Sequence, residues 1–137
     1  MLSPLIHQIA LSLLPGIGAV NARRLVASLG SVEAVFETGR KDMSNIRGLG
    51  EYHTNIVLNH REQALEEAQR EIEFINKYKL KTFFYLDRTY PRRLAQCVDA
   101  PVMLFMKGEV NLDASWIISV VGTRSATEYG RELTNTL

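Results

Sequence analysis

The sequence predicts an α + α/β fold, in which a helical domain over residues 1–78 precedes the beginning of a parallel α/β sheet over residues 79–137. Three observations lead to this division. Apolar residues recur at helical spacing as far as Ile75, two strand-like runs follow, and a continuous apolar stretch over 116–121 then meets a glycine turn. We place the boundary near residues 60–78, with a long helix as the joint.

The composition is typical of a soluble globular protein, with 46% hydrophobic and 23% charged residues. No apolar run reaches the ~20 residues of a membrane span, and the first residues lack a signal-peptide layout. We therefore expect a cytoplasmic protein without membrane contact. Cys97 has no second cysteine to pair with, and His7, His53 and His60 show no ligand spacing, so neither a metal nor another cofactor is expected.

Charge is distributed unevenly along the chain. Residues 1–75 carry seven Lys/Arg and nine Asp/Glu, whereas residues 76–137 carry nine and six. A phosphate-binding surface would therefore draw most of its cations from the second half. Neither half is basic enough to predict nucleic-acid binding from charge alone.

Short helices are expected to fill the first part of the helical domain. Ser3 caps a helix with Pro4 at its first helical position, and Pro15-Gly16 ends it. A second helix is predicted over residues 19–29, with Gly30 as its C-terminal stop. The apolar faces of these two helices consist of Leu5, Ile6, Ile9 and Leu13, and of Ala22, Leu25, Val26 and Leu29.

Two further helices complete this domain. Ser31 caps a short helix that Gly39 closes, and the helical pattern resumes after Gly50 as a long helix. The apolar stripe of the long helix consists of Leu65, Ala68, Ile72 and Ile75. Its opposite face is most simply a solvated surface, made of Glu62, Glu66, Glu67, Arg70 and Glu71.

The pattern changes to β around Lys79. Residues 82–86 and 102–106 are strand-like runs bounded by turn residues. Tyr90-Pro91 and Ala100-Pro101 punctuate the segment between them, and we expect Tyr90 to pack or to anchor a turn rather than to stack on a base.

The third β-like run, Trp116–Val121, is apolar nearly throughout, as expected of a strand buried on both faces, with Trp116 in the core. A glycine then turns the chain, and Ser125 or Thr127 caps a helix through Tyr129. A strand, a tight turn and a helix N-terminus present unpaired backbone N–H groups to an anion, and an arginine adds a cation. The predicted phosphate-binding residues are Gly122, Thr123, Arg124, Ser125 and Thr127.

A sheet of this kind needs several more strand–helix units than the seven residues after Gly130 can supply. We therefore expect these residues to be the front part of a longer protein. The second domain is expected to expose apolar surface over the residues present here.

Two glycine pairs fit a helix–hairpin–helix pattern. Within residues 14–22 two glycines let the backbone turn tightly and approach a phosphate, while Ile17 anchors the hairpin. Residues 46–50 repeat this core, with Thr54 where a small alanine belongs. Such hairpins either bind phosphate or only join packed helices, and the sequence leaves both open. The candidate phosphate contacts are Gly16, Gly18, Gly48 and Gly50.

Three motifs follow the hairpins in order. They are Tyr90–Leu94, Asp99–Gly108, and Val120–Arg124 with Tyr129-Gly130. In this order and spacing the chain resembles the DprA (also called Smf) family, bacterial DNA-processing proteins of natural transformation. The family usually has a serine before x-Tyr-Gly, where this chain has Ala126-Thr127 and keeps a hydroxyl.

The resemblance implies a sterile-alpha-motif-like helical domain with helix–hairpin–helix motifs, followed by an extended Rossmann-like domain. It also implies a protein that is not an enzyme, that binds and protects single-stranded DNA, and that passes it to the RecA recombinase. A homodimer is implied for the full-length protein. By motif match, Gly122, Thr123, Arg124 and Ser125 line the single-strand pocket.

Two other functions stay open. A nucleotide-binding Rossmann-like enzyme could use the same turn, although residues 122–127 lack the second and third glycines of G-x-G-x-x-G. The helical domain could instead be a protein-interaction module without DNA contact. The sequence contains no nucleophile elbow or paired-carboxylate motif that would predict catalysis.

Overall fold

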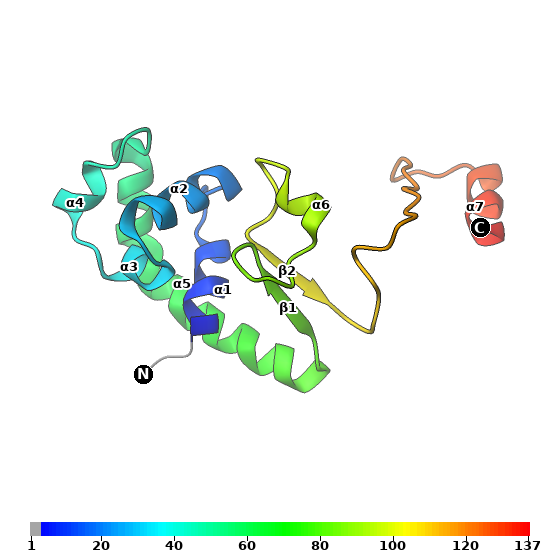
Figure 1. The fold of residues 1–137 in the computed structure, drawn as a ribbon, viewed down its shortest axis with the longest axis horizontal. Coiled ribbons are helices and arrows are strands. Elements are labelled where there is room, and N and C mark those ends of the chain that lie inside the picture. The colour runs from blue at the N-terminus through cyan, green and yellow to red at the C-terminus, as the bar shows by residue number, and fades with distance from the viewer. Residues whose placement is uncertain (1–3) are drawn as a thin grey trace.

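Residues 4–137, described by a computed structural model, form a helical body, a small two-stranded sheet beside it and a C-terminal helix that lies apart (Figure 1). Ser3, the predicted cap of the first helix, lies outside the described residues. The elements in chain order are α1 (Pro4–Leu13), α2 (Ala19–Leu29), α3 (Val32–Glu37), α4 (Arg40–Ser44), α5 (Gly50–Tyr78), β1 (Lys81–Phe84), α6 (Arg92–Ala95), β2 (Met103–Met106) and α7 (Glu128–Thr136).

The helical body follows its capping signals closely. α2 has the predicted bounds, and Gly30 ends it at φ +89°, where its N–H bonds to the carbonyl of Val26. The Ser31 hydroxyl accepts the Ala34 N–H at 3.1 Å, which confirms the predicted cap of α3. α1 packs along α5, and its face with Ile9 is fully buried between the helices.

Helix α5 spans 29 residues and joins the helical body to the sheet. Its buried face extends from Thr54 to Ile75, as the apolar period predicts for the second half of the helix. The helix ends at Lys79, which adopts a left-handed conformation at φ +53°. α4, which precedes it, was not predicted, because its five residues bury only Met43 and so show no apolar period.

The sheet consists of β1 and β2 in antiparallel register, with Lys81 opposite Met106 and Phe84 opposite Met103. These strands confirm the predicted runs to within two residues at either end. Phe84, Val102 and Met103 belong to the same buried cluster as the residues of α1 and α5. The hydrophobic core is therefore continuous from the helices into the sheet.

Tyr90 anchors the chain between the two strands, as predicted. Its ring is buried, and its hydroxyl donates to the Pro101 carbonyl at 2.6 Å. Burial raises the pKa of the Tyr90 phenol, and the positive charge of Arg23 acts in the opposite direction. The hydroxyl thus stays protonated and can donate at neutral pH.

A second connection, which we call the Arg23 clasp, ties α2 to the segment before β2. The Arg23 guanidinium donates to the carbonyls of Ala100 at 3.0 Å and Cys97 at 3.3 Å. Its carbon lies 5.0 Å from the centroid of the Tyr85 ring, a cation–π arrangement. Arg23 therefore joins the helical body to the sheet through side-chain contacts, in addition to the covalent link through α5.

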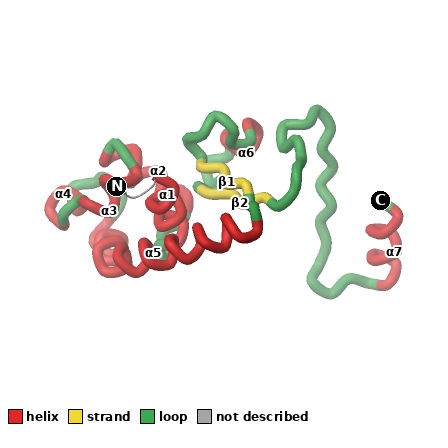
Figure 2. Tube along the Cα trace, turned by 90° about the horizontal axis from the view of Figure 1, so that it is seen from below, coloured by secondary structure: helices red, strands yellow, loops and turns green. Residues whose placement is uncertain are grey.

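The prediction of a buried strand over residues 116–121 is wrong. Trp116 is 94% exposed and Val121 92% exposed, and the segment runs as an extended loop toward α7 (Figure 2). A strand is stable only when a neighbour pairs with its backbone groups. β1 and β2 pair with each other, and no other strand exists within residues 4–137.

This has two consequences for the predicted fold. The described residues contain a small antiparallel sheet and no parallel one, so the predicted start of a parallel sheet is not formed here. The prediction that this part of the chain exposes apolar surface is confirmed by the exposed side chains of Ile117, Ile118 and Val120. Across residues 4–137 no helix, α5 included, is both long and apolar enough for a bilayer span.

Candidate nucleic-acid interface

The glycine turn lies between the extended loop and α7. The Thr127 hydroxyl accepts the Gly130 N–H at 3.2 Å, so Thr127, and not Ser125, caps α7. Glu128 lies in the first turn, where a carboxylate complements the helix dipole. The helix N-terminus that the sequence predicts is therefore formed within the described chain.

The five predicted turn residues are all exposed and close in sequence. Four of them, all except Arg124, form with Val120 and Leu133 part of the wall of a hollow of about 500 Å³ between the turn and α7. The Thr123 hydroxyl donates to the Ser125 carbonyl at 2.8 Å, which tightens the turn.

Contacts within residues 4–137 explain neither the positive charge of Arg124 nor the absence of a side chain at Gly122. Arg124 is exposed and makes no hydrogen bond or ion pair in that range. Gly122 has no left-handed backbone conformation, and a Cβ atom there would meet no atom within 4 Å. Neither backbone strain nor packing explains the glycine.

The hairpin glycines differ in their surroundings. Gly16 has φ +69°, and a Cβ atom would lie 3.3 Å from Cδ1 of Ile56. Gly48 has φ +80°, and its Cβ atom would lie 3.3 Å from the guanidinium carbon of Arg24. These two glycines are therefore required by backbone conformation and packing. Gly18 has φ −73° and open space around its Cα.

A polar network connects the two hairpins. One Arg24 nitrogen, Nη1, donates to the Gly48 carbonyl at 2.7 Å and to Asn21 Oδ1 at 2.9 Å. The Asn21 amide lies 3.1 Å from His53 Nε2, and His53 Nδ1 contacts the Leu49 carbonyl. The Leu49 carbonyl can only accept, so Nδ1 carries the proton and Nε2 accepts from Asn21. Arg24 is thereby committed to holding the hairpins together, which favours packing as their role.

Substitutions at Gly16 and at Gly18 of the first hairpin are expected to change the stability by different amounts. We expect Gly16→Ala to lower the free energy of unfolding by roughly 1–2 kcal/mol, because alanine is strained at positive φ. Gly18→Val should leave the stability within about 1 kcal/mol, because its backbone is extended and its surroundings are open. Chemical denaturation followed by circular dichroism measures both changes.

DNA titration of the same two proteins then separates the roles. If Gly18 approaches a phosphate, Gly18→Val weakens oligonucleotide binding at unchanged stability. Unchanged binding by Gly18→Val would assign the first hairpin to packing alone.

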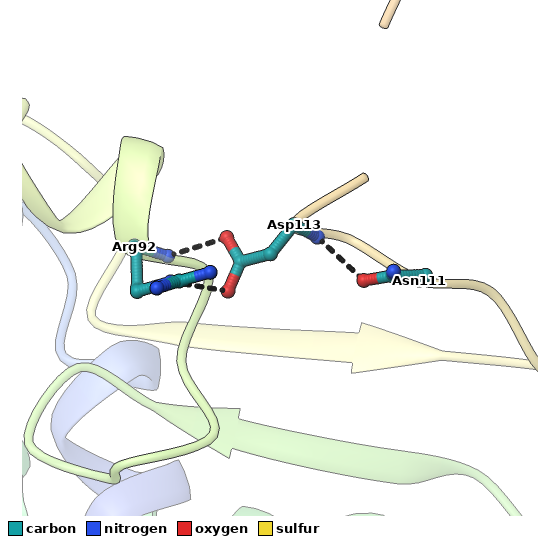
Figure 3. Close-up of polar contacts among 3 residues, drawn as sticks. All are labelled: Arg92, Asn111 and Asp113. Carbon is teal, nitrogen blue, oxygen red and sulfur yellow. Dashed lines mark hydrogen bonds and ion pairs between the residues drawn. The ribbon is translucent and has the colours of Figure 1, made fainter. Parts of the chain in front are cut away.

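Residues 111–115 are fixed against α6 (Figure 3). The Asp113 carboxylate accepts the Arg92 backbone N–H at 2.9 Å and its Nε at 3.2 Å, and the Asn111 side chain accepts the Asp113 N–H at 3.0 Å. Arg93 donates to the Ser115 carbonyl at 3.2 Å. The Arg92 charge is thus paired, and both arginines hold the start of the extended loop.

An exposed aromatic pair at the end of α5 was not predicted from the sequence. The rings of Phe74 and Tyr78 lie 4.3 Å apart between centroids, and both side chains are about half exposed. The ammonium groups of Lys77 and Lys107 lie 5.5 and 5.9 Å from the Tyr78 ring centroid. The spacing of Phe74, Lys77 and Tyr78 at three and four residues could have revealed this cluster from the sequence.

Comparison with known proteins gives matches to part of the chain. Residues 81–137, from β1 through α7, match the family model described as DNA recombination-mediator protein A. The DNA processing protein DprA of Streptococcus pneumoniae is 36% identical over 66 residues, which are 48% of this chain and 22% of that protein. The aligned region thus covers about a fifth of the length of this relative. No solved structure gives a significant match. By these matches residues 81–137 resemble the DNA recombination-mediator protein A family.

Proposed function

We propose that this protein binds single-stranded DNA at the turn of residues 122–127. The observation that carries the proposal is Arg124, an exposed cation without a partner in residues 4–137, placed three residues before the cap of α7. Backbone N–H groups at a helix start bind phosphate oxygens, and an adjacent arginine can add a charged, two-pronged contact.

Gly122 supports the same proposal. Since neither packing nor a left-handed conformation calls for glycine there, its lack of a side chain suits the close approach of a ligand to the backbone. Single strands suit such a turn, because their backbone bends locally, whereas a stiff duplex cannot follow a narrow turn.

The resemblance of the motifs and the family match over residues 81–137 extend this proposal to the whole protein. We propose that residues 1–78 are a sterile-alpha-motif-like domain and that residues 79–137 are part of an extended Rossmann-like domain. The bound strand is protected and passed to RecA, by a protein that is a homodimer at full length and has no catalytic activity. The S. pneumoniae relative is named as a DNA processing protein, which agrees with this role.

Replacing Arg124 tests the site. We expect Arg124→Ala to lower the affinity for an unstructured oligonucleotide about tenfold, since hydrogen bonds to charged groups are worth roughly 1.5–3 kcal/mol. The loss should be similar for all sequences, because a phosphate contact carries no base information. The dependence of log K on log salt should flatten by about 0.7, the value for one single-strand phosphate. Fluorescence anisotropy at several salt concentrations measures both.

The matched control is Arg88→Ala, which removes the same charge from the exposed turn after β1. It should change neither the affinity nor the salt slope beyond a small general effect. Equal behaviour of the two variants would contradict a phosphate contact by Arg124. A mononucleotide that competes as well as the oligonucleotide would favour a nucleotide-binding enzyme instead.

A further inference from the structure

The C-terminal end of α5, the start of β1 and the end of β2 meet at one corner of the molecule (Figures 1 and 2). The register places Lys81 opposite Met106, so Lys107 follows directly beside the end of α5. We call the side chains of Phe74, Lys77, Tyr78 and Lys107 at this corner the junction platform. None of them belongs to the glycine turn or to either hairpin.

The aromatic part of the platform is unusual for a helix surface. Phe74 is 50% exposed and Tyr78 43% exposed, and the two rings contact each other at an interplanar angle of 43°. Two large rings left half in water carry an apolar cost that packing within the described chain does not remove. The Tyr78 ring contacts Phe74, and half of the Phe74 side chain stays accessible to a ligand.

Two cations lie near the Tyr78 ring of this pair. Lys77 and Lys107 lie within 6 Å of the Tyr78 centroid, and both are exposed. Lys79 is also exposed and follows directly after α5. Lys81 contributes less, because its ammonium is paired with Glu109 at 2.8 Å. Lys77, Lys79 and Lys107 thus have no ion-pair partner within residues 4–137, and two of them, Lys77 and Lys107, lie near the Tyr78 ring.

Acidic groups near the platform limit what it can bind. Glu71 lies one turn before Phe74 on α5, and Glu73 one turn before Lys77. A uniformly basic surface would attract any polyanion, whereas this corner combines lysines of α5 and of the residue after β2 with carboxylates of α5 and Glu109. A ligand that combines a flat apolar ring with a few separate anionic groups fits both the aromatic pair and the lysines.

We propose that the junction platform is a second binding site for single-stranded DNA, in which Phe74 stacks on an unpaired base while Lys77 and Lys107 contact the flanking phosphates. Stacking requires an unpaired base, because both faces of a paired base are covered inside a duplex. This inference rests on the proposed function for its ligand class, but it uses different residues from the turn.

A short oligonucleotide tests the platform separately from the turn. Binding of labelled hexathymidylate to the 137-residue chain is measured by anisotropy for Phe74→Leu and Phe74→Tyr, each with and without Arg124→Ala. We expect Phe74→Leu to weaken binding about tenfold in both backgrounds, since stacking is worth roughly 1–3 kcal/mol per base, and Phe74→Tyr to retain binding within about twofold. Leucine keeps an apolar contact with Tyr78, and circular dichroism confirms that each variant is folded.

Lysine variants test the phosphate contacts. Lys107→Gln should flatten the salt slope by about 0.7. Lys41→Gln, on α4 at the other end of α5, is the matched control and should leave the slope unchanged.

The outcomes separate this inference from the proposed function. A tenfold loss with Phe74→Leu and none with Arg124→Ala supports the platform and contradicts the turn. Unchanged binding by Phe74→Leu overturns the platform, as does an equal loss with Phe74→Tyr. The platform is also overturned if Phe74→Leu weakens binding to duplex DNA equally, or weakens binding to phosphatidylserine vesicles while leaving hexathymidylate binding unchanged.

Discussion

Phe84→Ala is expected to lower the free energy of unfolding by about 3–5 kcal/mol, the usual range for removing a fully buried phenylalanine. Phe84 is 1% exposed and belongs to the cluster that connects β1 with α1 and α5. The cavity would lie where the sheet meets the helices. Because this core is continuous, we expect one cooperative transition at a lower denaturant concentration, visible in the helical signal of far-UV circular dichroism.

Phe105→Ala, in the same sheet, is the matched control. This ring is about half exposed, so its removal should change the stability by only about 1 kcal/mol. An unchanged helical transition in Phe84→Ala would show that the sheet unfolds independently. That outcome would place a folding boundary near residue 78, where the sequence predicts the division between domains.

Arg23→Ala should be the second most disruptive change, with an expected loss of roughly 3 kcal/mol from two hydrogen bonds made by a charged group. The substitution removes the Arg23 clasp and leaves the buried Ala100 carbonyl without this donor. The Cys97 carbonyl and the face of Tyr85 lose a contact in the same step. Urea denaturation of the variant and of the unchanged protein gives the difference.

Arg92→Ala provides the comparison for a surface arginine. Its side chain is 81% exposed although it pairs with Asp113, and exposed ion pairs contribute only about 0–1 kcal/mol. A loss in Arg23→Ala no larger than in Arg92→Ala would mean that the clasp adds nothing to the stability of the connection.

The sequence predicts those parts of the fold that local chemistry determines. The bounds of α2 and the caps at Ser31 and Thr127 follow from capping residues and from apolar spacing over one or two turns. α4 and α6 were missed because helices of five and four residues contain too few apolar positions to show a period.

The local apolar pattern of residues 116–121 is not sufficient to predict their structure. An apolar run predicts that a segment can be a buried strand, but pairing and burial depend on neighbours distant in the chain. Within residues 4–137 those neighbours are absent, so Trp116 lies in solvent. The Arg23 clasp could not be predicted from local spacing either, because its hydrogen-bond partners lie 74 and 77 residues further along the chain.

One part of the candidate site could likewise be predicted from the sequence, and another part could not. The turn residues were found because a glycine, an arginine and a capping threonine lie close together in the sequence. The junction platform combines residues of α5 with Lys107, which follows β2, so only the Phe74–Tyr78 half of it was visible locally.

Helix α5 also sets the distance between the features at its two ends. Its 29 residues correspond to about 43 Å at 1.5 Å per residue, with no proline and no glycine after Gly50 to bend it. The second hairpin lies at one end and the Phe74–Tyr78 pair at the other. A partner that contacts both ends must therefore span the length of α5. A partner shorter than this helix cannot contact both ends at once.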